Sequence, residues 1–150
     1  MLYGKEKRKI WTMRICCGDA GKQIGKGRWM SSKKVIIHRR EGLEQIENYP
    51  HVNSRTGKVL YQKELTTEPE TGMMIEMIRY PKGCMIPSHT HHCGHGIYVL
   101  RGTLVTSEGN FKPGDYVWFD EGTVMTHGAG EEEDADILFI TNKKLDMNYL

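Results

Sequence analysis

The sequence predicts an all-β domain, either a β-sandwich or a small jelly-roll barrel, on three observations. From residue 73 onward, short apolar runs alternate with turn sequences that contain glycine, proline or aspartate. These runs are close together and regularly spaced, which is typical of sandwiches and barrels. No long amphipathic helical pattern competes with them, and no internal repeat of solenoid length is present.

The elements are expected at definite places along the chain. Residues 35–37 predict a short strand, and residues 42–47 predict a brief helical turn. Residues 53–58 are rich in turn-forming side chains, and a strand resumes at 59–61. The later strands are expected at residues 73–80, 85–91, 97–101, 103–107, 116–119, 124–127 and 136–141.

The composition is that of one globular domain. The chain has 150 residues, 38% hydrophobic and 27% charged, and this length is sufficient to bury a continuous core. No stretch approaches the roughly 18 apolar residues that a membrane span requires. The four cysteines (Cys16, Cys17, Cys84, Cys93) lack the spacing of a disulfide framework, so reduced thiols and a cytoplasmic location are expected.

Positive charge is concentrated in residues 1–34. This segment contains ten lysines and arginines and two acidic residues, which leaves residues 35–150 with a formal charge of −6. We interpret 1–34 as a basic, poorly ordered extension and 35–150 as a single domain, because the extension lacks periodic apolar spacing. A nucleic-acid-binding arm is the less favoured alternative.

The same segment suggests a second start site. Residues 25–29, immediately before Met30, can be encoded by purine-rich codons like those of a bacterial ribosome-binding site. The hypothesis is that the natural protein begins at Met30 and that residues 1–29 are translated upstream sequence. Met1 is the alternative start.

Histidines are concentrated in one short segment. Four of the seven lie within seven residues, namely His89, His91, His92 and His95. Residues i and i+2 of a strand face the same side, so His89 and His91 can address one point while His92 faces away. His95 begins the next strand on its inward face, and His127 ends a later one. Neutral imidazoles from two or more strands make a transition-metal site.

Other interpretations of the histidines stay open. They could form a surface tract that captures metal adventitiously, or join Cys84 and Cys93 in a structural zinc site. The buried site is favoured, because the cysteines lack zinc-finger spacing and such clustering is not expected by chance. His38 and His51 stand alone and are expected to make ordinary hydrogen bonds.

The spacing of these residues resembles the first motif of the cupin superfamily. In that motif a glycine is followed by five residues, His-x-His, three or four residues, a glutamate, six residues and a second glycine. Here Gly83, His89, His91 and Gly102 fit every spacing, and His95 stands at the glutamate position.

A later segment is similar to the second cupin motif, more loosely. Gly114 and Gly122 match its glycines, and Asp120 replaces its proline. Met125 stands where the motif has its histidine, and His127 lies two residues beyond. A shift of two residues along a strand preserves the facing, so His127 can still point inward. The resemblance covers residues 71–141.

The resemblance implies a cupin-type double-stranded β-helix barrel with one divalent transition-metal ion per chain. By this resemblance, His89, His91 and His127 take the histidine ligand positions, and His95 is a fourth candidate ligand. Iron is favoured, with zinc, nickel, manganese and copper as alternatives. An all-histidine set leaves the charge of the metal uncompensated, which favours an anionic substrate or enolate.

The resemblance also implies a function. In its ligand types the chain is similar to all-histidine cupin dioxygenases, so an enzyme acting on a small carbonyl or carboxylate substrate is expected. A metal-dependent isomerase, lyase or decarboxylase, and a non-catalytic sensor or ligand-binding module, are the alternatives. Candidate catalytic residues are His95, Glu76 and Tyr98. Candidates for lining the cavity are Glu76, Tyr98, Arg101, Tyr116, Trp118 and Met125.

Two hydrophobic strands predict a homodimer. Residues 116–119 and 137–140 are apolar on both strand faces, which suits strands covered on one side by the opposite sheet and on the other by a second subunit or the N-terminal region. The acidic run at residues 131–136 is expected to be a solvated loop.

Overall fold

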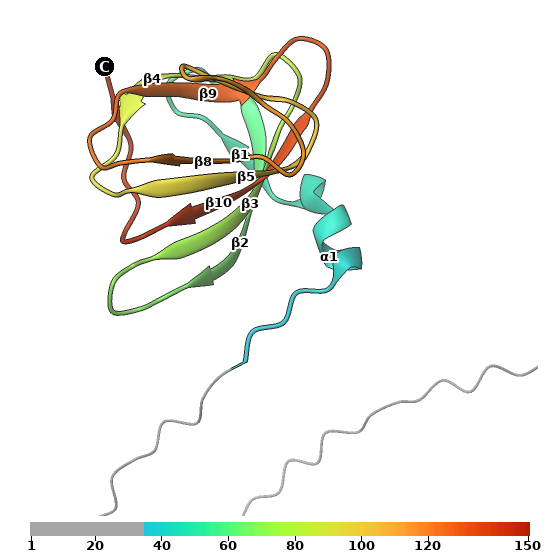
Figure 1. The fold of residues 1–150 in the computed structure, drawn as a ribbon. Coiled ribbons are helices and arrows are strands. Elements are labelled where there is room, and N and C mark those ends of the chain that lie inside the picture. The colour runs from blue at the N-terminus through green and yellow to red at the C-terminus, as the bar shows by residue number, and fades with distance from the viewer. Residues whose placement is uncertain (1–34) are drawn as a thin grey trace, which may run out of the picture. The chain divides into compact units, whose positions relative to one another are not determined.

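Two antiparallel β-sheets face each other in residues 35–150, the part of the chain that the computed structural model describes (Figure 1). The six-stranded sheet has the order β1-β2-β3-β10-β5-β8, and the five-stranded sheet has the order β11-β4-β9-β6-β7. Two short helical segments, α1 (Arg40–Glu44) and η1 (Ile46–Asn48), precede the first strand. No helix among these residues is long and apolar enough to cross a membrane.

The strands are short, as the sequence predicts. Those of the six-stranded sheet are β1 (Pro50–Val52), β2 (Val59–Thr67), β3 (Met74–Tyr80), β10 (Ala135–Thr141), β5 (His95–Arg101) and β8 (Tyr116–Phe119). Those of the five-stranded sheet are β11 (Asn148–Tyr149), β4 (Met85–Thr90), β9 (Met125–Ala129), β6 (Leu104–Thr106) and β7 (Gly109–Phe111).

The prediction of an all-β jelly-roll fold is confirmed, with local differences. The strand expected at 35–37 is wrong: these residues pair with no strand, and their side chains are 50% to 78% exposed. Strands β1, β7 and β11, of two or three residues each, are not among the predicted strands. The extension predicted at 1–34 and the start at Met30 lie outside the described residues and stay predictions.

The apolar core lies between the two sheets. Alternation along β5 turns Ile97 and Val99 inward, where they are at most 1% exposed, and His95 shares that face. Ile86 of β4 and Leu104 of β6 meet them from the opposite sheet. The histidine-bearing face of β5 is therefore part of the packed interior.

Asp136 departs from the expectation of a solvated acidic loop. It belongs to β10, and its side chain is 7% exposed. Arg79 donates two hydrogen bonds to its carboxylate, from Nε at 2.6 Å and from Nη2 at 2.9 Å. Arg101 donates a third from Nε at 2.9 Å. Because two guanidinium groups compensate this charge, burial of the carboxylate is tolerated.

Gly102 is required at the turn between β5 and β6. Its φ of +71° lies in the left-handed region, and a Cβ there would stand 2.0 Å from the carbonyl oxygen of Asp134. The substitution Gly102→Ala is expected to lower the free energy of unfolding by about 2–4 kcal/mol in urea titration. The control Gly57→Ala has a similar φ of +69° and open space around the Cβ, so it should lose only about 1–2 kcal/mol. Equal losses in the two variants would contradict the steric argument.

The homodimer stays a prediction, and the structure suggests where to test it. Four apolar side chains on the outer face of β5 and β8 are 39% to 51% exposed: Tyr98, Leu100, Tyr116 and Trp118. We expect Trp118→Glu to convert a dimer into a monomer in sedimentation velocity, because it places a charge in this patch. Val124→Glu, at an exposed apolar position on another strand connection, is the matched control. A monomeric wild-type protein at micromolar concentration would refute the prediction.

Candidate metal centre

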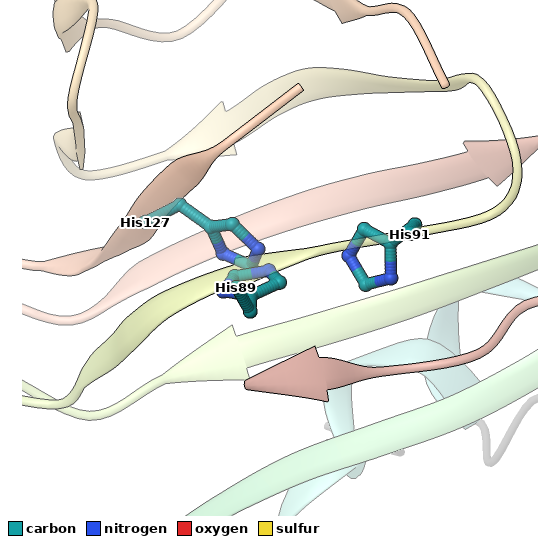
Figure 2. A group of neighbouring side chains, drawn as sticks. All are labelled: His89, His91 and His127. Carbon is teal, nitrogen blue, oxygen red and sulfur yellow. The ribbon is translucent and has the colours of Figure 1, made fainter. Parts of the chain in front are cut away.

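Three histidines on two paired strands converge in the interior. Strands β4 and β9 place Ile86 opposite His127 and His89 opposite Met125. His91 follows β4 directly, so it faces the same side as His89. All three side chains are at most 3% exposed, and one ring nitrogen of each lies within 4.8 Å of the others (Figure 2).

The Nδ1 atom of each ring is engaged by a neighbouring oxygen. His89 Nδ1 donates to the carbonyl of Pro87 at 2.6 Å, and His91 Nδ1 donates to the carbonyl of Asp146. The Nδ1 of His127 bonds the hydroxyl of Tyr80 at 3.2 Å. A donated Nδ1–H fixes the tautomer in which Nε2 carries the free lone pair, and it also fixes the ring orientation.

The second ring nitrogen of each of these histidines, Nε2, is the one that makes no hydrogen bond to a described residue. In all three rings Nε2 is buried and has no hydrogen-bond partner among residues 35–150. A buried polar atom without a partner costs about 1–3 kcal/mol, so three of them in one place call for a ligand. Three converging imidazole lone pairs fit a transition-metal ion, and these residues could hold one.

The electrostatics keep these rings in the form that binds metal. Burial lowers the pKa of His89 and of His91, and it holds the pKa of His127 well below its usual range. The neighbouring imidazoles lower the pKa of His127 further. All three rings are therefore neutral near pH 7, and a neutral imidazole is the metal ligand.

His95 lies next to His89, His91 and His127, but it is not one of the residues whose ring nitrogens lie within 4.8 Å of one another. Its ring centroid is 4.8 Å from that of His91, and the ring packs between Phe119 and Phe139. Neither of its ring nitrogens has a hydrogen-bond partner in the described chain. Burial, and then the electrostatic interaction with the nearby His91 ring, lower the pKa of His95 to about 4.

His92 faces away, as the alternation predicts. Its ring is exposed and bonds the carboxylate of Asp146 outside the cluster.

A cavity of about 140 Å³ adjoins the cluster, and His91 and His127 form part of its wall. Its polar lining includes His51, Asn53, Gln62 and Glu76, and its apolar lining includes Leu60, Ile78, Ile86 and Phe139. Strands β1, β2 and β3 therefore bring polar groups to the side of the cavity opposite the histidines.

Glu76 is the acidic group of this cavity. It lies on the same face of β3 as Ile78 and Tyr80, and its carboxylate accepts no hydrogen bond from the described residues. Burial raises its pKa, and the charge of Glu64, its partner across β2 and β3, raises it further. A carboxyl group whose pKa is raised in this way is a candidate for proton transfer.

Comparison with known proteins identifies the family. A family model described as the ChrR cupin-like domain matches residues 39–146. The chain belongs to this family. A search of curated proteins finds no match to this cupin.

Solved structures agree with the fold of this cupin. A cupin-like protein from Thermotoga maritima matches 61% of this chain and 76% of its own, with 22% identity and a TM-score of 0.56. The polyketide cyclase RemF from Streptomyces resistomycificus matches 76% and 86%, with 16% identity and a TM-score of 0.58. A chain in the crystal structure of Rhodobacter sphaeroides SigE in complex with the anti-sigma ChrR matches over 55% of this chain and 45% of its own length, with 24% identity and a TM-score of 0.50. At these identities the likeness supports the fold alone.

The cavity of this cupin differs from the sequence expectation. Of the six side chains expected to line it, only Glu76 does so. Met125 is buried in the core. The other four lie on the outside because they alternate with the inward residues of β5 and β8 or follow them: Tyr98, Arg101, Tyr116 and Trp118. Tyr98, the third catalytic candidate, therefore does not reach the cavity.

The sequence interpretation also missed residues. It assigned His51 an ordinary role, yet the side chain of His51 lies at the cavity beside Asn53. Gln62 was not singled out from the sequence. Because it lies two residues after Leu60 along β2, strand alternation could have placed it on the inner face.

Proposed function

We propose that this cupin is a metal-dependent enzyme that acts on a small carbonyl or carboxylate compound, with dioxygenase-like overall chemistry. One observation carries the proposal. Two imidazoles of the buried three-histidine cluster, those of His91 and His127, and the carboxyl group of Glu76, whose pKa is raised, border the same small cavity. This combination of a metal-binding set and a proton-transferring group is what such a reaction requires.

The residues at the cavity would have distinct roles. His89, His91 and His127 would hold one divalent transition-metal ion, for which iron is the favoured identity and zinc, nickel, manganese and copper are alternatives. When bound, the ion would supply Lewis acidity to a carbonyl or carboxylate oxygen of the substrate.

Glu76 is assigned the proton transfer. Its carboxylate accepts a proton from the carbon next to the substrate carbonyl, and its raised pKa makes it a stronger base than an exposed glutamate. Tyr80 keeps its proton, since burial raises its pKa far above the usual value, and its hydroxyl orients His127. The apolar lining excludes bulk water from the reacting atoms.

His95 is proposed as a fourth metal ligand, because both of its ring nitrogens are buried without a partner. His95→Ala is expected to weaken metal affinity by more than about 100-fold, because loss of a ligand should cost more than loss of a group that only supports one, and competition with a chromogenic chelator measures the effect. Unchanged affinity together with reduced activity would remove His95 from the ligand set and assign it to the bound substrate.

The experiment that tests the function has two readouts. The full chain is purified and iron-loaded without oxygen, and metal content per chain is measured by mass spectrometry. Deuterium exchange into hydroxyacetone is then followed by NMR without oxygen, and oxygen uptake is measured after air is admitted. About one metal per chain, accelerated exchange and substrate-dependent oxygen uptake are expected. Exchange without uptake would move the assignment to an isomerase or lyase, and stoichiometric metal without exchange would refute the proton-transfer mechanism.

A non-catalytic sensor is the second candidate, and the family match favours it. The matching family is described by ChrR, and a related fold occurs in a complex of an anti-sigma factor with SigE. A sensor would bind metal and a small ligand without turnover. A change in the thermal midpoint of unfolding on addition of a small ligand, with no loss of that ligand over hours, would support it.

A cytoplasmic location stays a prediction. The thiols of Cys84 and Cys93 are free and buried.

A further inference from the structure

The last strand, β11, and the residues just before it form one wall of the cavity. Strand β11 pairs with β4, placing Asn148 opposite Thr90 and Tyr149 opposite His89. Three alternating side chains of this segment line the cavity: Leu145, Met147 and Tyr149. The intervening Asp146 and Asn148 do not line the cavity, and the side-chain amide of Asn148 donates to the carboxylate of Asp146 at 2.8 Å.

Hydrogen bonds hold this wall in place at several points. The carbonyl of Asp146 accepts the Nδ1–H of His91, which ties the wall to the metal-binding group. The carboxylate of Asp146 accepts a hydrogen bond from the backbone N–H of His92 at 2.7 Å. Asn53 donates to the hydroxyl of Tyr149 at 2.7 Å, which closes the far side. A wall fixed in this way limits the size of what the cavity admits.

The volume sets that limit. An apolar protein cavity of about 150 Å³ accommodates benzene, a molecule of six carbon atoms. The cavity here is of similar size, about 140 Å³. Drug-sized ligands need pockets of about 300–1,000 Å³. The space beside the histidines therefore suits a ligand of roughly six or seven non-hydrogen atoms.

The side chains of the wall differ in how firmly they fill space. Met147 is 41% exposed and flexible, so it can swing away from the mouth of the cavity. Leu145 is partly buried and packs against the hydrophobic core, so it cannot withdraw without loss of that packing. Tyr149 also packs against the core, and its hydroxyl accepts a hydrogen bond from Asn53, so Leu145 is the wall residue whose size can be changed without loss of a hydrogen bond.

We propose that the wall formed by Leu145, Met147 and Tyr149 restricts this site to small oxygen-chelating ligands of about six or seven non-hydrogen atoms, with Leu145 as the specificity-determining residue. The proposal rests on the metal site of the proposed function but not on its reaction.

A pair of probes with the same chelating group tests the size limit. The full chain is loaded with cobalt(II), and its visible spectrum is titrated with acetohydroxamate and with benzohydroxamate. Wild-type protein is expected to bind acetohydroxamate at least about tenfold more tightly, because the phenyl ring meets the wall. Leu145→Ala is expected to bind benzohydroxamate about tenfold more tightly than wild type does, with little change for acetohydroxamate.

Controls separate this inference from the function on which it rests. Leu100→Ala makes the same change on the outer face and should keep the wild-type preference. Leu145→Val, a milder change, should give a smaller gain in the same direction if the alanine variant does not fold. Equal binding of both probes to wild type, or no gain in either Leu145 variant, would overturn the size limit while leaving the metal site intact. Failure to bind cobalt would overturn the metal site itself.

Discussion

His91→Ala and His89→Ala are each expected to lose most of the bound metal, with affinity falling by more than about 100-fold. The magnitude follows from the geometry, since each substitution removes one of the three ring nitrogens that lie within 4.8 Å of one another and are proposed as ligands. Loss of a group that only supports a ligand already costs about 10- to 100-fold, so loss of the ligand itself should cost more. Chelator competition and mass spectrometry of the purified variants measure the effect.

His38→Ala is the matched control for these variants. It makes the same chemical change at an exposed histidine that hydrogen-bonds the Leu65 carbonyl far along the chain. It should keep wild-type metal content. Full metal retention in His89→Ala and His91→Ala would mean that the metal is held elsewhere.

The cluster of His89, His91 and His127 could be predicted because it follows from local spacing. His89 and His91 lie two residues apart, and strand alternation alone turns both to one side. His127, which lies two residues beyond the histidine position of the second cupin motif, could be predicted for the same reason, because a shift of two residues along a strand leaves a side chain on the same face. Most strand positions after residue 73 could also be predicted, because apolar runs and glycine turns are local signals.

The cavity could not be predicted, because its walls depend on pairing between distant strands. Residues 116–119 are apolar on both faces, so alternation does not say that Tyr116 and Trp118 face outward. His51 and Gln62 line the cavity only because β1 pairs with β2 and β2 pairs with β3 in the six-stranded sheet. The carbonyl of Asp146 holds His91 through its backbone, and a backbone contact leaves no trace in residue type.

Glu76→Gln is expected to reduce the rate of proton exchange and turnover about 100- to 10,000-fold while metal content stays at the wild-type level. The substitution keeps the size of the side chain and removes only its capacity to accept a proton. The two readouts separate the role of Glu76 from a structural one, because disruption of the cavity would also reduce the affinity for metal. A variant that exchanges protons at the wild-type rate would refute the role of Glu76 as the base.

Glu64→Gln gives a sharper test of the same assignment. Glu64 is exposed and stands opposite Glu76, and its charge contributes to the raised pKa of Glu76. Removing that charge lowers the pKa of Glu76. A general base acts in its deprotonated form, so the acidic limb of the pH–rate profile for proton exchange should move to lower pH, with the plateau rate little changed. A base elsewhere in the cavity would leave this limb in place, since only Glu76 is paired with Glu64 across the two strands.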